Sequence, residues 1–409
     1  MIGRATEITV LAVTAALALA GSGLVREGQA VPTARPGVAT SPTVAFLKAR
    51  AVEDPLDYVA HNRLASSYVK LLRDSGEFAY LELAAVEARA SLAAVPAERN
   101  PGGLSALALV DFESHDFAGA LSSAERAYRI DPNNTGALAL CGDAELELGN
   151  YENAARIYDQ LGTDAASAPV LARRARLAEL HGHTEDAGRL LAQAGDQDGW
   201  YHVRRGELLF RAGDLDGAER EYSKAPQSFA QLDHLAELRA AQGRYDEAVA
   251  AYSGLFERSG RAETLQALGD LYSFRGQPEQ AKPWYDRARA AYLDSVAAGN
   301  NHYLHHLAEF YCDSEEDPAE ALRWARKDLQ VRHSIYAWDA LAWALYKSGD
   351  FAGARDASAK ATALGTRDAH LLYHAAMISL RTGDAEKGRS LLQQVLVVNP
   401  AYNRFHVHR

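Results

Sequence analysis

Histidines grouped on one segment are the residues of this chain whose spacing best suits chemistry. His302 and His306 lie four positions apart, and Glu309 follows three positions later. Side chains at i and i+4 share one face of a helix, and two imidazoles placed in this way are a workable pair of metal ligands. The sequence forces no third ligand next to them, so polar side chains on a helix face are the better interpretation. We predict no metal and no other cofactor, and keep His302 and His306 only as weak candidates for metal ligands.

Motifs that carry the common enzyme chemistries are missing from the sequence. It has no glycine-rich phosphate loop, no G-x-S-x-G turn, no H-E-x-x-H helix and no C-x-x-C pair. The net charge of −11 comes without basic blocks, which argues against nucleic acid or an anionic membrane surface as the target. We therefore predict a protein that is not an enzyme and binds neither nucleic acid nor, beyond a possible N-terminal anchor, a membrane.

The histidine-bearing segment belongs to a part of the chain in which small residues recur with a fixed period. Glycines follow one another at intervals of 30 to 34 residues, apart from one interval of about two periods: Gly149, Gly182, Gly213, Gly243, Gly276, Gly349 and Gly383. Glu316 lies where the missing glycine of the wide interval would fall, and a Gly or Ala lies seven positions before each glycine. A period of this length predicts stacked two-helix units, each of which packs only on its neighbours.

The recurring positions resemble the tetratricopeptide repeat. In the unit that begins near residue 262 the family's marks are Leu265, Leu268, Gly269, Tyr272, Ala281, Tyr285 and Ala288, and "AYRIDPNN" at 127–134 is similar to its usual repeat ending. The resemblance covers about residues 58–400, with units starting near 58, 101, 135, 168, 199, 229, 262, 302, 335 and 369. It implies an all-α fold, a right-handed α-solenoid of stacked antiparallel helix pairs.

The unit at 302 departs from the pattern, because "SEEDP" replaces its turn glycine and its second helix lacks the usual aromatic residue. We expect the superhelix to change curvature there. The interpretation is an N-terminal array of about seven units over 58–300, a C-terminal array of three units over 301–400, and a tail at 401–409.

The N-terminus has the pattern of an export segment. Arg4 precedes the apolar stretch "ITVLAVTAALALA", and Ala18 and Ala20 supply the small-x-small pattern that signal peptidase accepts. Residues 1–20 are therefore predicted to be a signal peptide or an N-terminal anchor, followed by a flexible leader over 21–55. We expect a bacterial protein that is exported, periplasmic or extracellular, and that is either free or anchored to the membrane by its N-terminal segment.

The resemblance also implies a concave groove lined by the second, fifth, ninth and twelfth residues of each unit. In the last three units these positions include many aromatic side chains, and the predicted binding residues are Tyr303, His306, Phe310, Tyr336, Asp339, Trp343, Tyr346, His370, Tyr373 and Met377. Clustered aromatic side chains on a groove are typical of a binding surface. The alternative is that they pack on one another. Trp338 is expected in the core and Trp343 in the groove.

We predict a non-enzymatic scaffold that binds a protein or peptide segment in its concave groove. Two alternatives remain open. One is a periplasmic metal- or small-ligand-binding protein that uses the histidine-rich C-terminal third. The other is a structural subunit of an envelope or secretion complex that uses the convex face.

Overall fold

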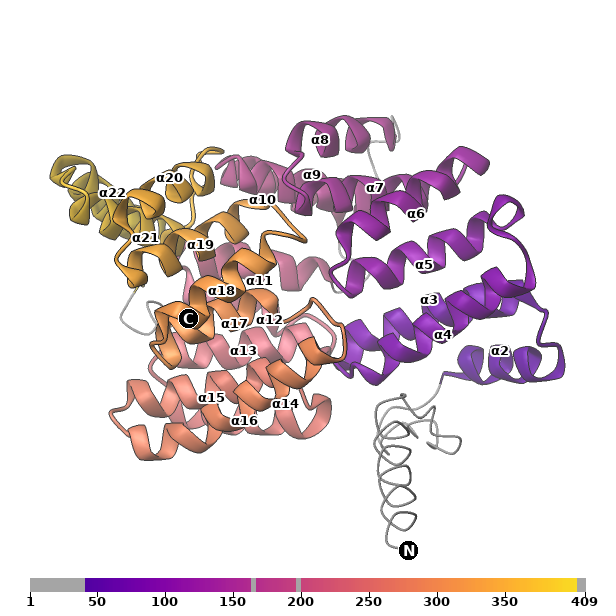
Figure 1. Cartoon of the computed structure of the whole chain (residues 1–409), viewed down its shortest axis with the longest axis horizontal. Helices are drawn as coiled ribbons and strands as arrows, with labels where there is room; N and C mark the ends of the chain where they lie inside the picture. The colour runs from indigo at the N-terminus through magenta and orange to yellow at the C-terminus, as the bar shows by residue number, and fades with distance from the viewer. Residues whose placement is uncertain (1–40, 163–166, 196–199, 403–409) are drawn as a thin grey trace, which may run out of the picture. The chain divides into compact units, whose positions relative to one another are not determined.

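Residues 41–162, 167–195 and 200–402 are described by the computed structural model, and these residues form helices without any strand (Figure 1). The first helices of the repeat units are α3 (Tyr58–Ser75), α5 (Pro101–Glu113), α7 (Thr135–Glu147), α9 (Ala168–Leu180), α11 (Trp200–Arg211), α13 (Phe229–Ala241), α15 (Ala262–Phe274), α17 (Leu304–Glu309), α19 (Ile335–Ser348) and α21 (Ala369–Arg381). The second helices are α4 (Ala79–Ala94), α6 (Phe117–Ile130), α8 (Tyr151–Gln160), α10 (Thr184–Ala194), α12 (Leu215–Tyr222), α14 (Tyr245–Ser259), α16 (Pro278–Ala297), α18 (Pro318–Asp328), α20 (Phe351–Ala361) and α22 (Ala385–Val398). The predicted helical solenoid of stacked pairs is confirmed.

Several pairs have a glycine where their two helices cross, and the others have an alanine there. A β-carbon added at Gly142 would lie 2.5 Å from the ring of Tyr158, and one at Gly269 would lie 2.4 Å from the ring of Tyr285. Larger residues at these positions would push the helix axes apart. Tyr158 also makes a polar contact, because its hydroxyl donates a hydrogen bond of 2.9 Å to Asp143.

The unit at 302 keeps the turn without its glycine. Glu316 adopts a φ of 53°, as His115 does with 57° in the second unit. The last residues of its first helix form a π-helix, η2 (Phe310–Ser314), which accommodates the altered turn. Glu316 thus occupies the conformational role that the sequence assigned to the missing glycine.

Units five or six positions apart along the chain also touch. The backbone N–H of His333 donates to the carbonyl of Glu147 at 3.0 Å, and that of Ile335 donates to the hydroxyl of Tyr151 at 2.8 Å. These bonds join α19 to the turn between α7 and α8. The Thr366 hydroxyl, which precedes α21, bonds in the same way to a carbonyl at the end of α9. The expectation that each unit packs only on its neighbours is therefore wrong.

Further contacts join the first two units to the units that begin at 229, 262 and 302. The ring of His302 lies 4.9 Å from that of Phe78 and 4.5 Å from that of His115. The guanidinium of Arg261 lies 4.3 Å from the centre of the Phe78 ring and 4.8 Å from that of Phe229. The later units thus lie directly against the turns of the earlier ones.

The N-terminal predictions fare differently. Helix α2 (Pro42–Glu53) occupies part of the expected leader over 21–55, and that expectation is wrong there because Val44 and Leu47 are buried against the first unit. The signal or anchor segment at 1–20 lies outside the described residues. The described residues from Pro42 onward form one compact unit, and the division into two arrays at residue 301 stays a prediction. None of the helices in the described part of the chain has the length and apolar character needed to cross a membrane.

Two turn glycines make a matched test of the contact between distant units. Gly182 and Gly243 have φ of 73° and 75°, so alanine at either position has a similar cost of about 1–2 kcal/mol for the left-handed backbone. A β-carbon at Gly182 would lie 2.4 Å from the carbonyl oxygen of Gly365, whereas one at Gly243 would meet nothing within 4 Å. Gly182→Ala should therefore lower the free energy of unfolding by a further ~1–3 kcal/mol relative to Gly243→Ala. Chemical denaturation measures both, and equal losses would contradict the contact.

His115, in the turn of the second unit, predicts that the folded protein loses stability in acid. Burial lowers the pKa of His115 to about 3, with a further lowering from Arg332 and His306. The unfolded chain binds this proton below about pH 6.5 and the folded chain does not, so stability falls as the pH drops from about 6.5 towards 3. His115→Asn, which tolerates a positive φ, should lose less stability between pH 7 and 4 than the wild type. Thermal unfolding at both pH values measures this, and equal losses would assign the acid sensitivity to other groups.

Candidate peptide-binding groove

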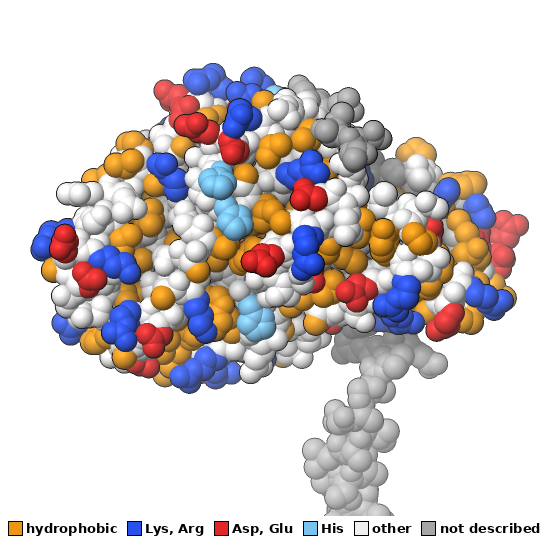
Figure 2. Space-filling view, turned by 90° about the horizontal axis from the view of Figure 1, so that it is seen from above, with side chains coloured by type: hydrophobic (Ala, Val, Ile, Leu, Met, Phe, Trp, Pro, Cys, Tyr) orange, Lys and Arg blue, Asp and Glu red, His pale blue; other side chains and the backbone are white. Residues whose placement is uncertain are grey.

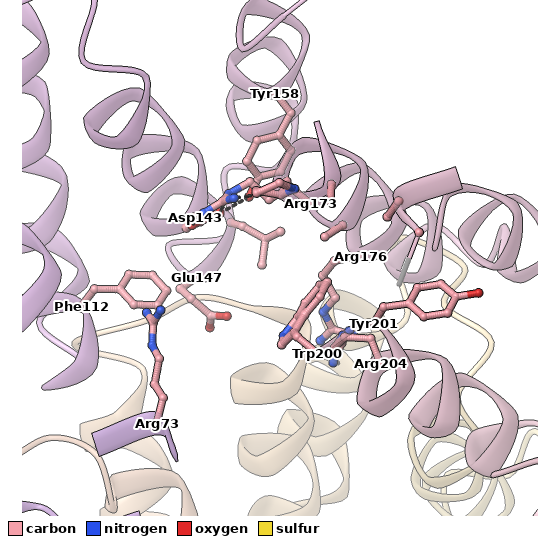
Figure 3. Close-up of a pocket in the computed structure, with 16 residues that line it drawn as sticks. Arg73, Phe112, Asp143, Glu147, Tyr158, Arg173, Arg176, Trp200, Tyr201 and Arg204 are labelled. Atoms are coloured by element: carbon pink, nitrogen blue, oxygen red, sulfur yellow. Dashed lines mark hydrogen bonds and ion pairs between the residues drawn. The ribbon is translucent and has the colours of Figure 1, made fainter. Parts of the chain in front are cut away.

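A cavity of about 550 Å³ opens on the inner faces of the units that begin at 101, 135, 168 and 199. Its lining includes the second, fifth, ninth or twelfth residue of these units, the positions that the family resemblance assigns to the groove: Phe112, Asp143, Leu146, Pro169, Ala172, Arg176 and Trp200. Figure 3 shows side chains directed into this space from α3, α5, α7, α9 and α11. The positional rule therefore finds a real cavity, but in earlier units than those chosen from the sequence.

Asp143 organises one wall of the cavity. The guanidinium of Arg173 donates to both carboxylate oxygens, from Nε at 2.8 Å and from Nη2 at 2.7 Å. The hydroxyl of Tyr158 donates to the same carboxylate at 2.9 Å. Burial raises the pKa of this phenol, so it stays a neutral donor. Each member is fixed by the others, which gives the wall a defined shape (Figure 3).

A second wall carries excess positive charge. Burial by itself would raise the pKa of Glu179, but the guanidinium groups of Arg211, Arg176 and Arg204 lower it to about 2. Arg176 donates to this carboxylate at 2.9 Å, and Arg204 lies 3.5 Å from it. Arg204 also pairs with Glu207. The group still has more guanidinium than carboxylate charge, and a planar guanidinium is well suited to bind a further carboxylate.

Trp200 supplies the apolar part of the cavity. Its side chain is 46% exposed at the start of α11, whereas the other tryptophans of the chain are buried or partly buried. The ring of Phe112 lines the same space from α5 (Figure 3). An exposed indole in a concave site is the kind of residue that anchors protein interfaces. By contrast, the face shown in Figure 2 mixes acidic and basic side chains with scattered apolar ones.

The structure places the binding residues predicted in the C-terminal units on inner helices, where they fall into two groups. Tyr303, Phe310, Asp339 and Trp343 are buried. His306, Tyr336, Tyr346, His370, Tyr373 and Met377 are partly exposed. Tyr303 and Phe310 belong to one apolar cluster, with ring centres 4.8 and 5.9 Å from that of Tyr292. The aromatic side chains thus pack to a large extent on one another, and binding by the partly exposed group stays a prediction.

The structure overturns the role expected of one tryptophan, Trp343, whereas the other, Trp338, still packs against two apolar core clusters. Trp343 is 5% exposed, its indole N–H donates to Asp313 at 3.0 Å, and its ring stacks on that of His374 at 4.0 Å. Trp338, expected in the core, is partly exposed beneath the amine of Lys360 at 3.8 Å. The expectation of an accessible Trp343 is wrong because a neighbouring helix, α21, covers it.

Truncation of the two tryptophans tests which of them is the more deeply buried. Trp343→Ala should lower the free energy of unfolding by about 3–5 kcal/mol, since it removes a buried ring and leaves Asp313 without its indole donor. Trp338→Ala should cost less, because its ring is partly exposed under the amine of Lys360, although it also packs against two apolar clusters. Denaturation of both variants gives the order, and a larger loss for Trp338→Ala would contradict the assignment.

Metal-ligating side chains converge at a place that the sequence did not indicate. In the described part of the chain, one ligand atom from each of Asp339, His370 and His374 lies within 4.8 Å of the others. The weak candidates His302 and His306 are not in this group, and their ring centres are 5.9 Å apart. His374 was missed, although it lies four residues after His370, the same spacing that drew attention to His302 and His306.

Comparisons with known proteins agree with the repeat pattern. Tetratricopeptide repeat models match residues 111–177 and 228–294. The TPR repeat-containing protein YpiA of Bacillus subtilis (strain 168) is 27% identical over 175 residues, which are 41% of this chain and 39% of that protein. The chain therefore matches well under half the length of this curated relative.

Several solved structures are similar to most of the chain at low identity. The APC/C hetero-tetramer Cut9–Hcn1 is 14% identical, with 90% of this chain and 89% of that chain covered and a TM-score of 0.35. A tetratricopeptide repeat protein from Parabacteroides merdae is 16% identical, with 73% and 99% covered and a TM-score of 0.32. The human IFIT1 dimer with PPP-AAAA is 12% identical, with 86% and 85% covered and a TM-score of 0.46. The two tetratricopeptide repeat matches thus cover residues 111–177 and 228–294, and the helix pairs with small residues at their crossings continue the same pattern in the other described units.

Proposed function

We propose that this chain is a non-enzymatic scaffold that binds a segment of a partner protein in the cavity formed by the units at 101–199. The observation that carries the proposal is an exposed indole, Trp200, inside a cavity of about 550 Å³ at the groove positions of tetratricopeptide repeats. This volume lies within the range of roughly 300–1,000 Å³ that is usual for binding pockets. The tetratricopeptide repeat family itself implies an interaction scaffold, and the cavity supplies a specific place for the interaction.

The lining indicates the chemistry of the partner segment. Arg173, Arg176 and Arg204 border the cavity together with Trp200, and two carboxylates, Asp143 and Glu147, lie among them. Asp143 is already satisfied by Arg173 and Tyr158, which leaves the arginine-rich side to attract an acidic group. The segment that fits best carries a carboxylate next to a large apolar side chain. We further propose that binding takes place after export, on the basis of the apolar segment at 1–20.

Two exposed aromatic residues allow a controlled test of the cavity. Peptides would be selected from a random displayed library on the full-length chain, and their affinity measured by isothermal titration calorimetry. Trp200→Ala should weaken a selected peptide by about 2 kcal/mol or more, because aromatic anchors carry most of an interface's energy. Phe46→Ala, which removes a 60% exposed ring on α2, should leave the affinity unchanged.

The outcomes separate the possible binding surfaces. Peptides that enrich acidic and apolar residues together, and that lose affinity only with Trp200→Ala, would support the proposal. Peptides insensitive to Trp200→Ala but weakened by Tyr373→Ala would move the site to the C-terminal units. Equal effects of Trp200→Ala and Phe46→Ala would contradict a defined groove.

A further inference from the structure

We propose that Asp339, His370 and His374 form a binding site for one divalent transition-metal ion, with Zn²⁺ as the best-matched example. The site is separate from the cavity at Trp200 and does not depend on the peptide-binding proposal. His370 and His374 lie one turn apart on α21, and Asp339 faces them from α19. Two imidazoles and a carboxylate are a donor set suited to zinc or iron rather than to calcium or magnesium.

The distances between the three ligand atoms are close to those between ligands bound to one metal ion. One ligand atom from each residue lies within 4.8 Å of the others. Atoms bound to one ion at distances of roughly 2.0–2.2 Å can be at most about 4.4 Å apart. The three side chains therefore need small rotations, not a rearrangement of helices, to enclose an ion.

His374 shows the clearest sign of a missing partner. Its Nδ1 lies 2.8 Å from Oδ2 of Asp339, which holds the ring with the proton on Nδ1. Its other nitrogen, Nε2, is buried without a hydrogen-bond partner, and the residue is only 3% exposed. A buried ring nitrogen without a hydrogen-bond partner costs about 1–3 kcal/mol. An ion held by all three residues would lie between Nδ1 of His374 and the Asp339 carboxylate, in place of the Nδ1 proton, because a carboxylate bound to Nδ1 cannot also reach an ion at Nε2 of the same ring.

The space beside these residues has the size of an ion. A cavity of about 20 Å³ is lined by all three, together with Glu309 and the ring of Trp343. This volume holds about one water molecule or one ion. Trp343 stacks on His374 at 4.0 Å and so fixes the plane of the imidazole.

The surrounding charge favours a cation. Glu309 and Asp313 line the same cavity as Asp339, and no lysine or arginine belongs to that lining. Glu309 pairs with His305 at 3.1 Å, and Asp313 with Lys347 at 2.9 Å, so the excess is moderate. Asp313 reaches the lining from the π-helix η2, the irregular turn of the unit at 302.

A larger cavity adjoins the site at His370. His370 also lines a second cavity of about 180 Å³, which is bordered by Glu207, His234 and Asp368. The hydroxyl of Tyr402 lies 3.4 Å from Nδ1 of His370 on this side, where it can orient the ring as a second-shell partner does. His370 thus lines both the small cavity and the larger one.

Calorimetry on the full-length chain, stripped of metal with a chelator, tests the site directly with Zn²⁺ as the titrant. The wild type should bind one Zn²⁺ at the site, and its melting temperature should rise with added Zn²⁺. His370→Ala should weaken this binding at least about 100-fold, because it removes one of three protein ligands. Co²⁺ in place of Zn²⁺ should give a visible absorption band in the wild type that His370→Ala abolishes.

A second buried histidine–carboxylate pair provides the matched control. Nδ1 of His202 lies 2.7 Å from Glu221, and both residues are buried as His374 and Asp339 are, but no third ligand joins them. His202→Ala should bind Zn²⁺ as the wild type does. Saturable binding that survives in His370→Ala would place the metal on other histidines, and no saturable binding by the wild type would also overturn the proposal. If circular dichroism shows that His370→Ala does not fold, Asp339→Asn is judged by the same criterion.

Discussion

Contact between units five or six apart is the constraint on which the rest of the structure depends. The turn after an early first helix meets the segment that leads into or ends a later unit: Gly149 lies against His333, Gly182 against Gly365, and Gly213 against Asn399 and Pro400. At Gly149 and Gly182 the facing atom is a backbone carbonyl oxygen, which cannot move aside as a flexible side chain can. These glycines therefore end a helix and also admit a later unit at close range. Each of these glycines is therefore required twice, once by the turn of its own repeat unit and once by the close contact with a distant unit.

This winding decides which inner faces are available. His302 packs against Phe78 and His115 of the first two units, so the start of the unit at 302 is occupied by contacts within the chain. Further along the inner side, Tyr303 and Phe310 pack on Tyr292 in a continuous apolar cluster. The units at 101–199 retain a cavity, with Trp200 exposed inside it. The richest aromatic face in the sequence is thus mainly a packing surface, and a plainer face holds the open space.

The sequence predicted the unit and its internal packing well, because these depend on neighbours in the chain. The small residue at Gly142 under Tyr158 and the turn at Glu316 follow from the period alone. Contacts between distant units could not be predicted, since they depend on a small rotation per unit that accumulates over five or six units. Trp343 was assigned to the groove because of its position in the unit. The residue type did not correct this, since aromatic side chains serve burial and binding equally well. His374 was missed because His370 was assigned only to the groove, and the partner that joins the two histidines, Asp339, comes from another helix.

Because the chain winds on itself, titratable groups are buried inside it, and the partners of these groups show how their charges are balanced. Glu179 is held ionised by three guanidinium groups, and Glu309 pairs with His305. Replacing such buried pairs with apolar residues of similar size is often neutral or stabilising, so stability alone does not explain why they are present. Around Glu179 the surplus of guanidinium charge borders a cavity, and at His374 a ring nitrogen faces a space of ionic size without a partner. At His374 a buried ring nitrogen lacks a partner, and around Glu179 the three guanidinium groups outnumber the two carboxylates with which they pair. The two ligands proposed above, a cation in the first case and a carboxylate in the second, answer these opposite imbalances.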